Sequence, residues 1–273
     1  MGPLYSSLTG FWSMLLLATA LVPTFPATPV TQQTPTRIHQ TRELQSVIVY
    51  SDDFEGSAPN FSHTRSNIEG VGSIKAVTNP VFHGRQSAEF TVTNDGNSWR
   101  SEVAKNSLGF GNFSFAFANY LPTDWVDTSV NTIVAQWHGS KLTNGKNANP
   151  PIALSVRNNQ WELKVHYLKN PTDSKPKSHT YKLPKIVKGV WNRWDVRINW
   201  SRPEVEGTVV VILNDETVAK HQGDNNYHQK KAPYFKQGIY RPNWNPAKGH
   251  NYETGGPSVI VYCDNVVVTE FRG

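Results

Sequence analysis

The chain has 273 residues, of which 11% are aromatic and only 18% are charged, and its formal net charge is +6. This length fits one large domain, and all-β sandwiches often occupy such a length as a single unit. The chain has one cysteine, Cys263, which excludes an intrachain disulfide and a cysteine-based metal cluster. Because Cys263 lies in an apolar run, we expect a buried and inert thiol.

The N-terminal segment has the features of a secretion signal followed by a linker. The apolar run from Phe11 to Val22 is too short to span a bilayer and ends near small residues. We therefore expect a signal peptide over residues 1–20, although no Lys or Arg precedes the run, and a signal anchor is the alternative. Residues 21–46 are rich in Thr, Pro and Gln, which indicates a disordered linker or propeptide. We expect a single folded domain over residues 47–273 of a secreted protein.

Beyond residue 46, short runs rich in Val, Ile, Phe, Tyr and Trp recur between clusters of Gly, Pro and Asn, a pattern typical of strands and turns. The expected strands are 48–54, 88–93, 98–103, 113–118, 133–138, 152–156, 161–168, 194–200, 208–213, 217–220, 234–240 and 258–268. About a dozen strands without intervening helices predict an all-β fold. We expect a β-jelly roll, a concanavalin-like sandwich of two antiparallel sheets, with a polar groove on a concave face.

Three of the expected strands place polar side chains on one face and apolar side chains on the other, because side chains alternate along a strand. In the strand 133–138, for example, Gln136 and His138 share one face and Trp137 points to the other. The polar set comprises Arg100, Glu102, Gln136, His138, Lys236 and Tyr240. If the three strands belong to one sheet, these side chains converge on one surface.

Such a set suits the removal of a proton next to a carboxylate. In a uronic acid polymer the C5 hydrogen lies α to a carboxylate and the C4 oxygen carries the glycosidic bond, so loss of the proton can expel the leaving sugar by β-elimination. Arg100 and Gln136 can stabilise the negative charge that gathers on the carboxylate. His138 is the expected base, because an imidazole ordinarily titrates near neutral pH, and Tyr240 is the expected acid.

The remaining polar side chains have supporting parts in this scheme. We expect Lys236 or Arg241 to be the cation that assists Tyr240. Glu102 has no proton to move, and we expect it to orient Arg100.

The same segments resemble the three signature strands of β-jelly-roll polysaccharide lyases. They are residues 99–103 (WRSEV), 136–138 (QWH) and 234–240 (YFKQGIY). Alginate lyases of that fold carry Ile or Val where Trp137 stands. Residues 136–139 (QWHG), 238–241 (GIYR) and 261–266 (VYCDNV) are more similar to the glucuronan lyase and heparin lyase I group.

The resemblance implies His138 as base, Tyr240 as acid or as both acid and base, and Arg100 with Gln136 as the groups that neutralise the carboxylate. Contacts to neighbouring sugars or sulfates are implied for Lys236, Lys164 and His166. Further substrate contacts are expected from Glu102, Arg241 and Trp99, although packing in the core is an equal alternative for Trp99. Heparin lyases use an additional Cys near the site, whereas Cys263 lies in the closing strand, which argues against heparin.

A structural metal is a further expectation. Asp53 and Glu55 near the first strand and Asp264 on the closing strand supply the oxygen ligands that suit Ca²⁺. Carboxylates that cap turns are the alternative explanation. Catalysis itself is expected to need no cofactor.

Three functions remain open on the sequence alone. The leading hypothesis is a secreted lyase that cuts a β-1,4-linked, glucuronan-like polyuronate and leaves 4,5-unsaturated ends, with alginate and heparin-type polymers as alternative substrates. Glycoside hydrolysis is less favoured, since it needs two facing carboxylates and Glu102 is the one strong acidic candidate. A lectin for acidic glycans is the third. The basic charge indicates an acidic partner, and the expected secretion favours an acidic polysaccharide over nucleic acid. We expect a monomer without stable membrane association.

Overall fold

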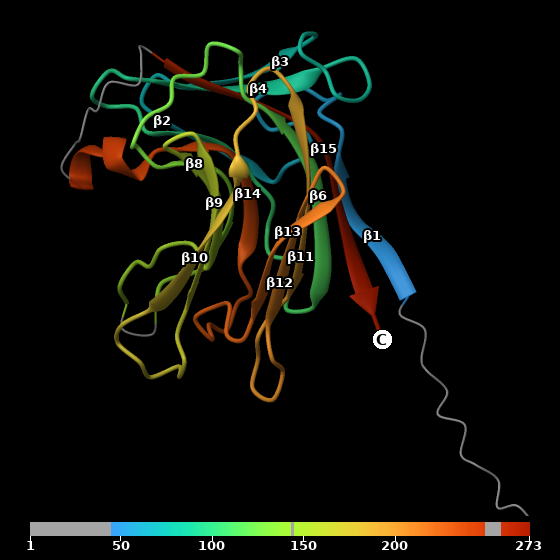
Figure 1. The fold of residues 1–273 in the computed structure, drawn as a ribbon, viewed down its shortest axis with the longest axis vertical. Helices are drawn as coiled ribbons and strands as arrows, with labels where there is room; N and C mark the ends of the chain where they lie inside the picture. The colour runs from blue at the N-terminus through green and yellow to red at the C-terminus, as the bar shows by residue number, and fades with distance from the viewer. Residues whose placement is uncertain (1–44, 143–144, 249–257) are drawn as a thin grey trace, which may run out of the picture. The chain divides into compact units, whose positions relative to one another are not determined.

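The computed structural model describes residues 45–142, 145–248 and 258–273, which all belong to the compact unit from Arg42 to Gly273 (Figure 1). The expected signal peptide and nearly all of the expected linker lie outside the described residues. No helix within the described ranges is both long and apolar enough to cross a membrane.

The described residues form two antiparallel sheets and two short 3₁₀ helices, which confirms the predicted all-β jelly roll. The elements are β1 (Gln45–Asp52), β2 (Arg65–Glu69), β3 (Ser73–Val77), β4 (Ser87–Thr93), β5 (Arg100–Ala104), β6 (Asn112–Tyr120), β7 (Thr132–His138), β8 (Ile152–Arg157), β9 (Gln160–Tyr167), β10 (Lys177–Lys185), β11 (Trp191–Asn199), β12 (Thr208–Leu213), β13 (Glu216–Gln222), β14 (Tyr234–Tyr240), η1 (Pro242–Trp244), η2 (Pro246–Lys248) and β15 (Ser258–Arg272). One sheet has the order β13-β12-β11-β6-β15-β4-β3, with β1 paired to β15. The other has the order β10-β9-β8-β7-β14-β5-β2 (Figure 1).

Three strands were not expected from the sequence, namely β2, β3 and β10, and all three lie at sheet edges. An edge strand exposes much of its surface, so its side chains need not alternate between apolar and polar. Strand β10 shows this clearly, because most of its side chains are exposed. Polar and charged side chains on such edges also discourage pairing with other chains.

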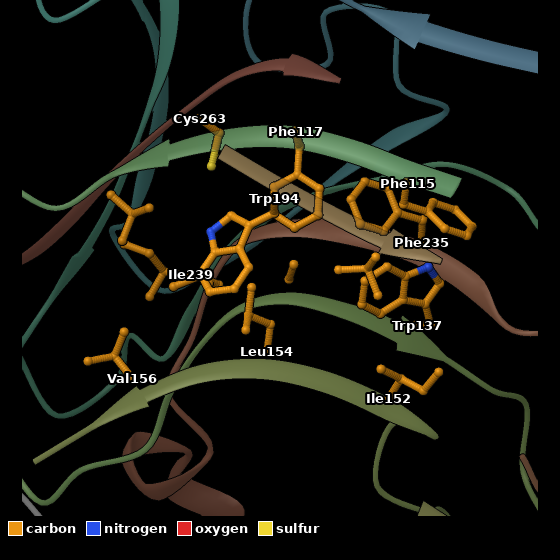
Figure 2. Packing of buried hydrophobic residues seen from close by; sticks show 14 of the residues in the cluster. Phe115, Phe117, Trp137, Ile152, Leu154, Val156, Trp194, Phe235, Ile239 and Cys263 are labelled. Atoms are coloured by element: carbon orange, nitrogen blue, oxygen red, sulfur yellow. The ribbon is translucent and has the colours of Figure 1, made fainter. Parts of the chain in front are cut away.

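The core lies between the two sheets and is rich in aromatic side chains that point toward one another from both layers (Figure 2). Phe115 of β6 meets Trp137 of β7 edge to face, with ring centroids 5.2 Å apart. Phe235 of β14 lies 5.3 Å from Trp137 and 5.4 Å from Phe115. Each of the strands β7 and β14 therefore buries an aromatic side chain in the core and leaves its opposite face for other contacts.

Cys263 of β15 is fully buried in this core, as the sequence predicts (Figure 2). Burial, with a smaller contribution from neighbouring Asp264, raises the pKa of its thiol well above the ordinary value. A thiol that stays protonated is a poor nucleophile.

Candidate active site

The three strands that carry the expected polar set are neighbours, in the order β7-β14-β5, in the seven-stranded sheet. Tyr240 pairs with Arg100 across β14 and β5, while Lys236 pairs with Gln136 across β14 and β7. The polar side chains therefore occupy the face of the sheet that points away from the core, as the alternation predicts.

A local irregularity in β7 sets which of its side chains reach that face. Val134 and Ala135 both lie in the core, and the pairing with β8 shifts register between Ile133 and Ala135. This bulge returns Ile133 to the same face as Gln136. Ile133 there forms a small apolar cluster with Ala153 and Tyr240, against which Trp99 packs.

A buried carboxylate, Glu102, organises the centre of the site. Its side chain accepts hydrogen bonds from Gln136 Nε2 and Lys236 Nζ, and Arg100 Nε lies 2.9 Å from its Oε2 atom. Glu102 is 1% exposed, Lys236 2% and Gln136 0%. We call these four residues the Glu102 cluster; its two cations and one anion leave one positive charge in excess.

The Glu102 cluster places two of the expected substrate-contacting residues below the protein surface. Gln136 and Lys236 are buried and point to Glu102, and neither lines the cavity that contains His138 and Tyr240. The expected effect of Glu102 on Arg100 agrees with their ion pair. Burial lowers the pKa of Lys236, and the charge of Glu102 acts in the opposite direction.

Tyr240 is held by two cations, which are not the two that the sequence suggested. The Arg100 guanidinium carbon lies 4.3 Å from the centre of the Tyr240 ring, and Lys248 Nζ donates a hydrogen bond of 3.2 Å to the phenol oxygen. Arg241 instead stacks on Trp244 at 4.0 Å. It is 2% exposed, and its burial lowers its pKa to about 10.

The contacts of His138 define the protonation of its ring nitrogens. Its Nδ1 atom lies 2.6 Å from the carbonyl oxygen of Gly139, and a carbonyl can only accept, so Nδ1 carries the proton. In the neutral ring Nε2 is then free to take a proton. Burial, aided by the positive charge of Lys236, lowers the pKa of His138.

A cavity of about 470 Å³ opens over this face of the sheet. The expected site residues that line it are Arg100, His138, Lys164, His166 and Tyr240. The expected residues that do not line it are Glu102, Gln136, Lys236, Arg241 and Trp99. The cavity contains four basic side chains (Arg100, Arg157, Lys164 and Lys248), and its described lining has no Asp or Glu. It is therefore suited to an anionic ligand.

The lining residues that the sequence analysis missed include Arg157, Asn131 and Lys248. Arg157 is the last residue of β8, one residue beyond the expected strand. Because residues two apart on a strand share a face, extending the strand by one residue would have placed Arg157 on the same face as Ser155. Asn131 directly precedes β7, and Lys248 belongs to η2. Neither lies in a periodic pattern that would have marked it.

The three carboxylates expected to bind calcium are engaged separately. Asp53 accepts a hydrogen bond from the amide of Glu55 at 3.1 Å, and Glu55 accepts one from the amide of Gln86 at 3.0 Å. Asp264 accepts bonds from the amides of Phe82 and His83, at 2.9 and 3.0 Å. Within the described ranges, no group of three or more His, Cys, Asp or Glu side chains is placed to hold a metal. These residues do not fit a shared calcium site and instead bond to backbone amides.

Two packed antiparallel sheets with a cavity over the outer face of one of them place the chain among the β-jelly-roll proteins. A family model described as polysaccharide lyase matches residues 58–267, and the chain therefore belongs to the polysaccharide lyase family. No sequence among curated proteins matches it.

Several solved structures are similar to this chain at low sequence identity. The endo-β-1,4-glucuronan lyase from the fungus Trichoderma reesei has a TM-score of 0.71 and 20% identity, over 81% of this chain and 95% of that chain. The cellulose induced protein Cip1 has a TM-score of 0.52 and 12% identity, over 80% and 96%. An alginate lyase A1-II′ structure has a TM-score of 0.47 and 16% identity, over 71% and 82%.

Proposed function

We propose that this polysaccharide lyase cleaves a β-1,4-linked polyuronate by β-elimination, with glucuronan as the leading candidate substrate. One observation carries the proposal: the cavity that contains His138 and Tyr240 is lined by four basic side chains and, in its described part, by no acidic one. The fold similarity to glucuronan lyase makes glucuronan the first polymer to test.

The reaction begins with the C5 proton of a bound uronate. Neutral His138 takes this proton at Nε2, and the C5–H electron pair forms the C4–C5 double bond as the C4–O glycosidic bond breaks. Arg100, which lines the cavity, stabilises the charge that gathers on the uronate carboxylate. The excess positive charge of the Glu102 cluster acts in the same direction.

Tyr240 completes the elimination by donating its phenolic proton to the leaving C4 oxygen. The hydrogen bond from Lys248 and the guanidinium of Arg100 over the ring stabilise the negative charge that develops on the phenol oxygen. The imidazolium of His138 then loses its proton to solvent and the phenolate regains one, which restores both groups. In the alternative scheme, Tyr240 performs both proton transfers.

The other two functions are less well supported by the cavity. Glycoside hydrolysis needs two carboxyl groups that face the scissile bond, whereas the described lining carries none. A lectin would need the basic lining but has no use for the free Nε2 atom of His138 beside Tyr240.

The direct test incubates the purified protein with glucuronan, alginate and heparin side by side. We expect the ultraviolet absorbance of a conjugated, unsaturated uronate to rise with glucuronan. A rise with alginate or heparin alone would support the elimination reaction but would identify a different substrate. Binding without any rise in absorbance would favour the lectin.

We also propose that the protein is secreted, on the basis of the apolar run from Phe11 to Val22. Expression of the full chain in a secreting host should release a protein whose N-terminus lies near residue 21. Retention of an uncleaved chain at the membrane would support the signal anchor instead.

A further inference from the structure

One wall of the cavity, on the side of Tyr240 opposite to Arg100, is built by strands β7 and β8. Tyr240 pairs with Ile133 of β7, and Ile133 pairs with Ser155 of β8. Arg157, two residues after Ser155, has its side chain on the same face. Asn131, which precedes β7, lines the same cavity.

This wall contains buried polar atoms without partners. Asn131 Oδ1, Ser155 Oγ and Arg157 Nε are each buried and make no hydrogen bond within the described structure. Buried polar atoms are nearly always hydrogen-bonded, because each one that stays unpaired destabilises the fold. Three such atoms on residues that line one cavity therefore indicate a polar ligand.

Arg157 also differs from most other arginines of the domain in its charge environment. Among the ion pairs of the described residues, none includes Arg157, whereas Arg100 is paired with Glu102 and Arg197 with Asp195. An arginine that lines a cavity without a carboxylate partner can bind the carboxylate of a ligand in a bidentate manner.

Arg157 and Arg100 lie far enough apart to contact different sugars of one polymer. Strands β5 and β8 are separated by β14 and β7, so the backbones that carry the two arginines stand three strand spacings apart, about 14 Å. The apolar cluster of Ile133, Ala153 and Tyr240 lies between them. In a polyuronate every sugar carries a carboxylate, so a second cation is needed where a second sugar binds.

We propose that Asn131, Ser155 and Arg157 form a second sugar-binding subsite, which holds a uronate further along the polymer than the one that reacts. Arg157 binds its carboxylate, while Asn131 and Ser155 bind its hydroxyl groups. This inference rests on the proposed function, because it assumes that the ligand is a polyuronate.

The test compares Arg157→Gln with the wild type on glucuronan, with alginate as a second polymer. Because Arg157 lies away from the reacting atoms, we expect KM to rise about tenfold while kcat changes little. The matched control is Arg197→Gln, an exposed arginine on β11 of the other sheet, which should leave both constants unchanged. An unchanged KM in Arg157→Gln, or a loss confined to kcat, would overturn the subsite.

Calorimetric binding separates this inference from the proposed function. If the wild type eliminates none of the polymers, the proposed function fails, but glucuronan oligosaccharides should still bind about tenfold more weakly to Arg157→Gln. Equal binding by both proteins would overturn the subsite as well.

If Arg157→Gln does not fold, Asn131→Asp provides the same test, because a carboxylate placed beside Arg157 competes with that of the sugar. Asn131→Asp should weaken binding, and unchanged binding would count against the subsite.

Discussion

Glu102 and Lys236 are hydrogen-bonded to each other on adjacent strands beneath the cavity, and both are almost completely buried. A buried ion pair stabilises a fold weakly as a whole, but the loss of one partner leaves an uncompensated buried charge. Glu102 neutralises part of the charge of two cations, so its loss affects both Lys236 and Arg100.

We therefore predict that Glu102→Gln lowers the free energy of unfolding by about 3–5 kcal/mol, as measured by denaturant titration. Glu216→Gln, at an exposed position on β13, should change it by less than about 0.5 kcal/mol. If Glu102→Gln is as stable as the wild type, Glu102 does not compensate the buried charges of Lys236 and Arg100.

Tyr240→Phe removes the proton donor and keeps the ring beside Arg100. We predict that kcat falls by about 10²–10⁴-fold while polymer binding is retained. Tyr262→Phe, on β15 of the other sheet, is the matched control and should keep full activity. Turnover near the wild-type rate in Tyr240→Phe would remove Tyr240 from the mechanism.

Lys248→Met tests a cavity residue that the sequence analysis missed. It deletes the hydrogen bond to the Tyr240 oxygen, so we predict a fall in kcat of about tenfold, smaller than that caused by Tyr240→Phe. Lys248→Arg should recover part of the rate because it restores a positive donor. Equal rates in Lys248→Met and the wild type would show that this contact has no part in the reaction.

The pH dependence of kcat/KM follows from the protonation state of His138. The base must be neutral, so activity is present above its pKa and is lost as the pH falls through that value. Because burial lowers this pKa, we predict that the acid limb lies below the ordinary histidine value of 6.5. His138→Ala should remove most of the activity, whereas His166→Asn should leave the position of the limb unchanged. An acid limb above 6.5 would contradict the role of His138.

Gly238 allows β14 to lie close to β5. It has φ +130°, and a Cβ atom at this position would lie 2.3 Å from the carbonyl oxygen of Ser101. Gly223 has φ +118° with nothing within 4 Å of such an atom, so Gly223→Ala measures the backbone strain alone. We predict that Gly238→Ala lowers stability by more than the about 1–3 kcal/mol expected for Gly223→Ala. Equal melting temperatures would show that the close contact relaxes easily.

The alternation of side chains was sufficient to predict the face on which the polar set lies, since parity along a strand does not depend on tertiary context. It could not predict how deeply each of these side chains is buried. Gln136 and Lys236 lie on the expected face, but Glu102 on a neighbouring strand binds both beneath the cavity surface. That pairing depends on strand order and register, which one sequence does not display.

Other parts of the site depend on irregular backbone. The bulge at Val134 and Ala135 breaks the alternation and thereby brings Ile133 to the cavity face. The 3₁₀ turn that carries Lys248 has no periodic pattern to recognise. The edge strands β2, β3 and β10 escaped prediction because their stability comes from pairing with a neighbour more than from burial of their own side chains.

The burial of Cys263 has a practical consequence for measuring distances in this protein. With a single cysteine in the chain, and that one shielded from solvent, maleimide reagents should leave the native protein unlabelled. A cysteine introduced at an exposed position of β10 and another on β13 would thus accept a pair of spectroscopic probes without removal of the native thiol. The separation of these two edge strands could then be followed as a polysaccharide chain is added.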